Sequence, residues 1–209
     1  MASEKKDEKS AKSLESADRI QITVCGPNGS GKTSLIHRIL HDTLLEKTPV
    51  PTQNTQIFTQ TFFFSPSHFT KPEDKKDTSI ICSELINQEL FDPRYSKINS
   101  GMYFSSAEHI LIVVDIKTPP SPEELKDYFK LAGDQNREKI CLIVNKIDGS
   151  DQFDETKNPI KLLLEKANLN DIPVHYVSTK NNDGIEKLKG YLGIFNHSPR
   201  GIPLTTQIP

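Results

Sequence analysis

The sequence predicts an α/β domain built on a mostly parallel sheet of six strands, with helices on both faces. Three observations predict it. Strand patterns alternate with helical patterns along the chain, so that helices provide the crossovers that parallel strands require. Two strand patterns, at 109–116 and 140–144, are near-continuous apolar runs, which are typical of strands covered on both faces. A glycine-rich turn joins the first strand pattern to the first helical one.

The other elements follow from local periodicity. Residues 20–24 alternate and are rich in β-branched side chains, and residues 33–45 carry leucine and isoleucine at helical spacing. A polar stretch at 67–77 directly joins the strand patterns 57–64 and 80–82, so we expect those two strands to be antiparallel. Further patterns predict helices at 122–131, 154–167 and 184–191, and a last strand at 173–177.

One domain is expected between two tails. Residues 1–18 consist mostly of Lys, Glu, Asp, Ser and Ala, a composition that cannot bury enough apolar surface to order itself, so they predict a flexible charged tail. Residues 197–209 contain prolines and no periodicity, which predicts a second, loose tail. The span 19–196 between them has the size of a single common domain.

Charge, cysteines and hydropathy narrow the possible partners and location. A formal net charge of -2 leaves no global field to recruit nucleic acid or anionic lipid. Cys25, Cys82 and Cys141 each lie in an apolar run, which indicates buried thiols in a reducing compartment rather than disulfides. No apolar run approaches the ~20 residues of a membrane span, and neither end carries a lipidation signal. We therefore expect a cytoplasmic protein, without a direct membrane anchor, that is recruited to membranes only through partners.

The turn Gly26-x-x-x-x-Gly31-Lys32-Thr33 has the Walker A pattern of P-loop NTPases and stands where that pattern requires, between a strand and a helix. Its glycines let the backbone direct several N–H groups at phosphate oxygens, and the helix N-terminus adds partial positive charge. Lys32 is expected to contact the β- and γ-phosphates, and Thr33 to ligate Mg²⁺. The predicted phosphate-binding residues are Gly26, Asn28, Gly29, Ser30, Gly31, Lys32, Thr33 and Ser34.

A second motif predicts which base is bound. Asn145-Lys146-Ile147-Asp148 follows the strand pattern at 140–144, at the strand end where open α/β sheets bind ligands. Guanine presents two donors along one edge, N1–H and the 2-amino group, and the Asp148 carboxylate can accept both. Asn145 is expected to brace the loop, and the Lys146 stem to lie over the base. Ser178-Thr179-Lys180 follows the last strand in the same way, and a backbone N–H there is expected to bond the guanine carbonyl.

Together these motifs resemble those of Ras-superfamily small GTPases, and the likeness covers about residues 19–196. The resemblance implies the small-GTPase version of the P-loop NTPase fold, the cofactors GTP or GDP and Mg²⁺, and partners that are effectors or subunits of a complex. In that family a threonine of the first switch senses the ion and the γ-phosphate. Thr52 is the candidate here, with Thr55 as the fallback.

The second switch departs from the family pattern. Where the family has Asp-x-x-Gly followed by a catalytic glutamine, this chain has Glu84-Leu85-Ile86-Asn87-Gln88. The resemblance makes Glu84 the candidate magnesium ligand, through a longer side chain, and Gln88 the candidate for orienting the attacking water. Asn87 carries a side chain where the family's glycine gives its N–H to the γ-phosphate, and Asn28 can crowd an incoming arginine finger. Slow hydrolysis is therefore expected.

The preferred interpretation is a guanine-nucleotide-binding protein that hydrolyses GTP slowly if at all, regulating or assembling a cytosolic or trafficking complex. The altered second switch leaves open a non-enzymatic pseudo-GTPase that serves as an adaptor or scaffold subunit. A P-loop kinase or ABC-type ATPase is a third reading, against which stand the stretch 145–148 and the lack of Leu-Ser-Gly-Gly-Gln. His37 and His41 have no evident third ligand and are expected on a solvated helix face.

Overall fold

The structure is a computed structural model that describes residues 18–44, 54–62, 78–94, 100–149, 159–194 and 204–206. Its strands are β1 (Asp18–Cys25), β2 (Gln56–Phe62), β3 (Thr78–Glu84), β4 (His109–Asp115), β5 (Ile140–Asn145), β6 (Val174–Tyr176) and β7 (Leu204–Thr206). Its α-helices are α2 (Lys32–His41), α3 (Asn87–Leu90), α5 (Pro122–Ala132), α6 (Pro159–Ala167) and α7 (Ile185–Tyr191). Short 3-10 or π turns lie at Ser100–Phe104, Asp134–Lys139 and Ile147–Gly149.

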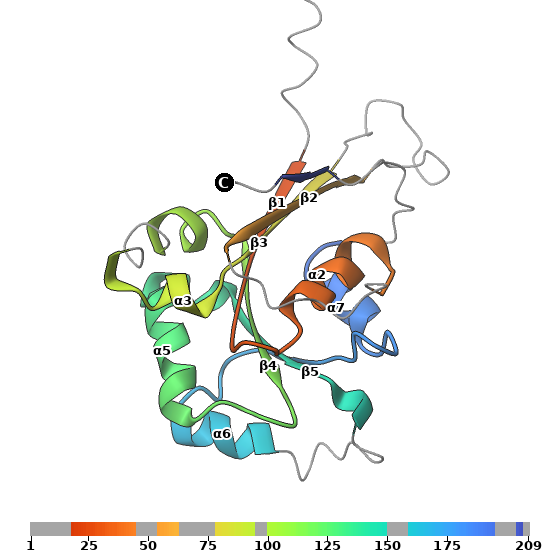
Figure 1. The fold of residues 1–209 in the computed structure, drawn as a ribbon. Helices are drawn as coiled ribbons and strands as arrows, with labels where there is room; N and C mark the ends of the chain where they lie inside the picture. The colour runs from red at the N-terminus through yellow and green to blue at the C-terminus, as the bar shows by residue number, and fades with distance from the viewer. Residues whose placement is uncertain are drawn as a thin grey trace, which may run out of the picture.

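All the strands belong to one seven-stranded sheet in the order β6-β5-β4-β1-β3-β2-β7. The strands from β6 to β3 are parallel, and β2 is antiparallel to β3, as the polar stretch at 67–77 that joins them directly predicts. Helices α2 and α7 cover one face and α5 and α6 the other (Figure 1). The predicted α/β fold, with a mostly parallel sheet covered on both faces, is confirmed.

The register of the sheet brings several predicted site residues to one edge. Val24 lies opposite Glu84 in the neighbouring strand, and Asp115 lies opposite Asn145. These residues stand at or next to the carboxyl ends of β1, β3, β4 and β5, which is the edge where open α/β sheets bind ligands. The glycine-rich turn leaves β1 at the same edge.

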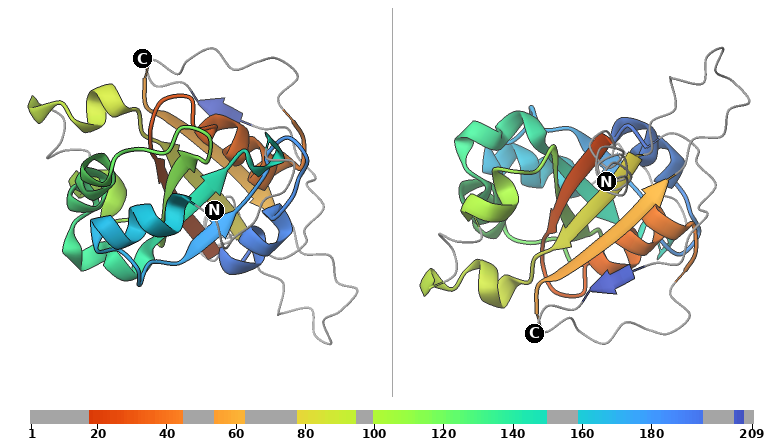
Figure 2. Two further views of the ribbon diagram at one scale, coloured as in Figure 1. Left: turned by 90° about the horizontal axis from the view of Figure 1, so that it is seen from below. Right: turned by 90° about the horizontal axis from the view of Figure 1, so that it is seen from above.

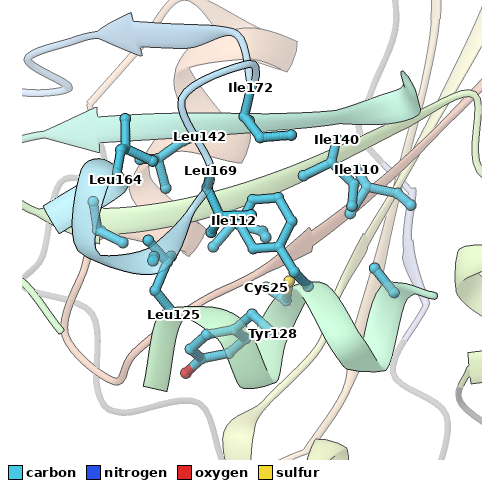
Figure 3. Packing of buried hydrophobic residues seen from close by; sticks show 14 of the residues in the cluster. Cys25, Ile110, Ile112, Leu125, Tyr128, Ile140, Leu142, Leu164, Leu169 and Ile172 are labelled. Carbon is cyan, nitrogen blue, oxygen red and sulfur yellow. The ribbon is translucent and has the colours of Figure 1, made fainter. Parts of the chain in front are cut away.

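Side chains of the central strands point alternately to the two faces and fill two layers of core. In β4, Ile112 and Val114 pack under α5 and α6, while Leu111 and Val113 pack under α2 and α7. Figure 3 shows the first layer, with Leu125 and Tyr128 of α5 lying over the sheet. The three cysteines are free and buried, as their apolar surroundings predict. Among the described residues, no helix is long and apolar enough to cross a bilayer.

The structure adds a seventh strand to the six that the sequence predicts, and this strand lies within the stretch expected to be a loose tail. Residues 204–206 form β7, which is antiparallel to β2 with Ile57 opposite Thr206 and Thr59 opposite Leu204. Figure 2 shows β7 in dark blue beside β2 in orange. Without β7, the outer edge of β2 would present unpaired N–H and C=O groups. The Leu-Thr-Thr stretch suits a strand, but three residues are too few to give a periodic signal.

Two helix boundaries also differ from the prediction. Helix α2 ends at His41 rather than near residue 45, because Asp42 adopts a left-handed conformation with φ 56° and its N–H bonds to the Arg38 carbonyl. Aspartate tolerates this conformation better than most residues, so it terminates the helix inside a still-apolar stretch. Helix α6 begins at Pro159, and the earlier start predicted at 154 lies outside the described residues.

Four half-buried histidines predict that the fold loses stability in mild acid. Burial is the largest cause that lowers the pKa of His37, His41, His109 and His175. His37 packs its ring against Phe58, and the rings of His109 and His175 both contact Tyr191. Below the ordinary histidine pKa of about 6.5, the unfolded chain therefore binds more protons than the folded protein does. Stability is fully present above that pH and falls as the pH drops through the lowered values.

Urea unfolding curves at about pH 7.5 and about pH 5.5 measure this effect. The urea concentration at the midpoint of unfolding should be lower at about pH 5.5. His175→Gln removes one of the titrating groups and should reduce the difference between the two midpoints. A midpoint that rises on acidification would contradict the assignment.

Candidate functional site

The glycine-rich loop packs closely against the ends of β4 and β5. Gly26, Gly29 and Gly31 have φ values of 136°, 75° and 92°, a region that side chains rarely adopt. A Cβ on Gly26 would lie 2.1 Å from the Val113 carbonyl oxygen, and one on Gly31 would lie 2.4 Å from the Asn145 Nδ2. Conformation therefore favours glycine at all three positions, and close contact adds a second requirement for it at Gly26 and Gly31.

The Lys32 side chain lies buried and folded back over this loop. Its Nζ donates to the carbonyl oxygens of Gly26, at 3.0 Å, and Pro27, at 3.1 Å. Burial lowers the pKa of Lys32, and the nearby charge of Glu84 opposes that shift. A buried ammonium gains most from a close anion, so the residue is suited to bind a phosphate at the mouth of the loop.

Thr33 and Glu84, both predicted metal ligands, come together. The Thr33 Oγ1 donates to the Glu84 carboxylate and lies 2.9 Å from each of its oxygens. Glu84 is 2% exposed and stands at the end of β3. Its side chain, longer than the family's aspartate, reaches Thr33. A hydroxyl and a carboxylate are oxygen ligands of the kind that Mg²⁺ prefers, and these two residues fit that ion.

The first-switch threonines do not join this pair among the described residues. Thr52 lies outside them. The fallback, Thr55, stands just before β2 and donates its Oγ1 to Glu89 Oε2 at 2.5 Å, with its N–H 3.3 Å from the same oxygen. Thr55 thus contacts α3 rather than Thr33.

Asn145 ties the glycine-rich loop to both base-binding segments. It is fully buried, and its Nδ2 donates to the Ser30 carbonyl at 2.9 Å. Its Oδ1 accepts from the N–H of Lys146, at 2.8 Å, and from the N–H of Thr179, at 3.3 Å. These hydrogen bonds are the kind of contact that the predicted bracing role requires, since the Asn145 side chain joins the glycine-rich loop to the segments at 145–148 and 178–180.

Asp148 and Ser178 form the second link between the two base-binding segments. The Ser178 Oγ donates to Asp148 Oδ1 at 2.8 Å and accepts from the N–H of Asn181 at 3.0 Å. Thr179 is buried and Lys180 exposed in the same turn. The carboxylate predicted to recognise guanine is therefore held beside the segment predicted to bond the guanine carbonyl.

The remaining predicted residues are placed less tightly. Asn28 is exposed at the tip of the loop, and Ser34 is half-buried in the first turn of α2. The buried Ser30 Oγ has no hydrogen-bond partner among the described residues, which fits a loop whose polar groups serve a ligand. Gln88 is exposed on α3, and its side chain makes no hydrogen bond within the described part of the chain.

Two charged residues of the site were not predicted from the sequence. Asp115 ends β4, and its Oδ2 lies 2.7 Å from the Lys146 Nζ, which also donates to the Gly29 carbonyl at 2.7 Å. A carboxylate directly after a buried apolar run was the available signal. Arg38 is buried on α2 and donates to the turn at 178–180. Its place in an amphipathic helix gave no signal, because arginine there normally faces solvent.

Comparison with known families matches residues 21–148 to the Roc domain, "Ras of Complex, Roc, domain of DAPkinase". The match covers more than half of the 209-residue chain. It begins in β1, includes the glycine-rich loop and ends at Asp148, so Ser178–Lys180 falls beyond it. No curated protein matches the chain.

Proposed function

Because this chain belongs to the Roc domain family of Ras-superfamily small GTPases, we propose that it binds GTP and GDP with Mg²⁺ and hydrolyses GTP slowly if at all. In this proposal it acts in the cytosol by regulating or assembling a protein complex, and its partners are effectors or complex subunits. The family membership already makes it a GTP-binding, small-GTPase-like protein.

The observation that carries the proposal is the bracing by Asn145. Its amide bonds the Ser30 carbonyl and its oxygen accepts from Thr179, so the phosphate loop and the base segments form one continuous site. Lys32 supplies the cation for the phosphates, and Thr33 and Glu84 supply oxygen ligands for Mg²⁺. When bound, the ion neutralises charge on the β- and γ-phosphates.

The nucleotide that copurifies with the protein tests this function. After rapid purification in magnesium buffer and heat release, chromatography should identify GDP or GTP in close to equal molar amount with the protein. Adenine nucleotides at that level would favour the kinase or ATPase reading. A nucleotide-free protein that also fails to bind added GDP would leave only the empty scaffold.

The contacts of the second switch support slow or absent switching. The Tyr128 hydroxyl donates to Asn87 Oδ1 at 2.8 Å, and the Phe91 ring packs edge-on against Tyr128 at 5.3 Å. Burial is the main cause that raises the pKa of Tyr128, so this hydroxyl remains a donor. Leu90 is buried in the same core layer as Tyr128 of α5, and the Glu89 carboxylate accepts a hydrogen bond from the Thr55 hydroxyl. A segment held this way on α5 has little freedom to move toward a γ-phosphate.

We therefore expect residues 84–100 to behave alike with GDP and with a non-hydrolysable GTP analogue. A ligand shifts a conformational equilibrium only by its differential affinity for the two states. Asn87 stands in place of the family's glycine, whose N–H to the γ-phosphate creates that difference. Intrinsic turnover should fall at or below the unassisted Ras rate of about 10⁻⁴ per second. Hydrogen exchange across 84–100 with GDP and with the GTP analogue tests the first expectation. Single-turnover hydrolysis tests the second.

Asn87→Gly is the matched variant, since it releases Tyr128 and restores the glycine. It should increase the nucleotide dependence of exchange at 84–100. Strong γ-phosphate-dependent protection in the parent protein, or turnover well above the rate given, would show that Glu84 and Gln88 act as in ordinary family members.

A further inference from the structure

A buried arginine behind the base-binding segment has a role that neither the motifs nor the family match assigns. Arg38 is 9% exposed and stands in the last turns of α2. Its Nε donates to the Thr179 carbonyl at 2.8 Å, one terminal nitrogen to the Lys180 carbonyl at 3.1 Å, and the other to the Asp42 carbonyl at 2.8 Å. Among the described residues it forms no ion pair with a carboxylate.

This pairing is unusual in its chemistry. Burying a guanidinium is costly, and a carboxylate is its ordinary partner. Among the described residues, the planar fork is satisfied by backbone carbonyls alone, two of them consecutive in the turn at 178–180. Charge-assisted bonds from one rigid group to two neighbouring carbonyls fix the orientation of both peptide planes.

The orientation of those planes determines where their N–H groups point. In a trans peptide the carbonyl and the following N–H point in opposite directions. Arg38 draws the Thr179 carbonyl toward α2, so the Lys180 N–H is directed away from α2. That N–H has no hydrogen-bond partner among the described residues, whereas the neighbouring N–H groups of Thr179 and Asn181 bond to Asn145 and Ser178.

We infer that Arg38 is a positioning residue for base recognition, which holds the Thr179–Lys180 peptide so that the Lys180 N–H meets the guanine carbonyl. An N–H fixed in that direction favours a carbonyl acceptor and disfavours the adenine amino group, which is itself a donor. Arg38 thus contributes to selectivity without touching the nucleotide. The inference rests on the proposed function, since it concerns the same site.

Arg38→Met tests the role, with Arg38→Lys as a milder variant that keeps the charge but not the fork. The matched control is Arg137→Met, which removes a surface arginine whose side chain, within the part of the chain that the structure describes, bonds only to Asp171. For each protein, equilibrium titrations give the affinities for GDP, ADP and inorganic tripolyphosphate in magnesium buffer. Tripolyphosphate occupies the phosphate loop without a base and reports any general damage.

Arg38→Met should weaken GDP binding about tenfold or more, the equivalent of one or two lost hydrogen bonds. The affinities for ADP and tripolyphosphate should stay within about twofold, so the ratio of GDP to ADP affinity falls about tenfold. Arg38→Lys should lie between, and Arg137→Met should match the parent. If Arg38→Met does not fold, the ratio in Arg38→Lys decides.

An unchanged ratio, or an equal loss of affinity for all three ligands, would overturn the positioning role and leave a structural one. The parent protein separates this failure from the failure of the proposed function. A parent that prefers GDP, with variants that keep the preference, refutes Arg38 alone. A parent without any preference for GDP refutes the guanine site itself.

Discussion

Lys32→Ala is expected to weaken GTP binding by about 3 to 5 kcal/mol, the cost of leaving a buried charge without its partner. That loss corresponds to roughly a hundredfold to a few thousandfold in dissociation constant. Lys32 lies buried over the loop, where its described hydrogen bonds go only to the Gly26 and Pro27 carbonyls. The triphosphate in the proposed complex would supply the anionic partner that these carbonyls do not.

The fold should survive this substitution, because the strands and both core layers make no use of the Lys32 charge. Titration with a fluorescent GTP analogue measures the affinity, and circular dichroism checks the fold. Lys126→Ala is the control, since Lys126 is exposed on α5. If Lys32→Ala binds GTP as tightly as the parent protein, the glycine-rich loop is not the phosphate-binding site.

Asp148→Asn is expected to exchange the preference for guanine for a preference for xanthine. The carboxylate accepts from the two guanine donors, while an amide can donate to the carbonyl that replaces the amino group in xanthine. A site built on paired hydrogen bonds discriminates by on the order of 10⁴, so the ratio of the two affinities should change by a comparable factor.

The surroundings of Asp148 tolerate this exchange. The Ser178 Oγ donates to Oδ1 at 2.8 Å, and an asparagine oxygen can accept the same bond. Competition of GDP and xanthosine diphosphate for a bound fluorescent nucleotide measures the ratio. Asp127→Asn, an equal change on the exposed side of α5, should leave it unaltered. A persistent guanine preference in Asp148→Asn would mean that another group recognises the base edge.

Local patterns predicted the parts of this molecule that depend on local sequence. Apolar runs such as 109–116 and 140–144 were placed correctly as buried central strands, because burial on both faces leaves a direct trace in composition. The motif at 145–148 and the glycine-rich loop were placed at one sheet edge, because parallel strands share their carboxyl ends. Thr33 and Glu84, which the resemblance makes candidate ligands of one ion, lie within hydrogen-bond distance of each other.

The misses depend on contacts between distant segments. Strand β7 exists because β2 offers a free edge, a condition that three residues cannot signal. Asp115 acquires its role from the register that sets it opposite Asn145, and Arg38 from a turn 141 residues away. The motif alone presents Asn87 as an obstacle to the γ-phosphate, whereas in the fold it also accepts a hydrogen bond from Tyr128, 41 residues away.

A displacement titration measures whether this site selects guanine nucleotides. The full chain is loaded with fluorescent GDP in magnesium buffer and titrated with unlabelled GDP and, separately, ADP. Recognition of guanine by Asp148 predicts displacement by GDP at concentrations lower by on the order of 10⁴ than those required of ADP. Equal displacement by the two nucleotides would contradict it.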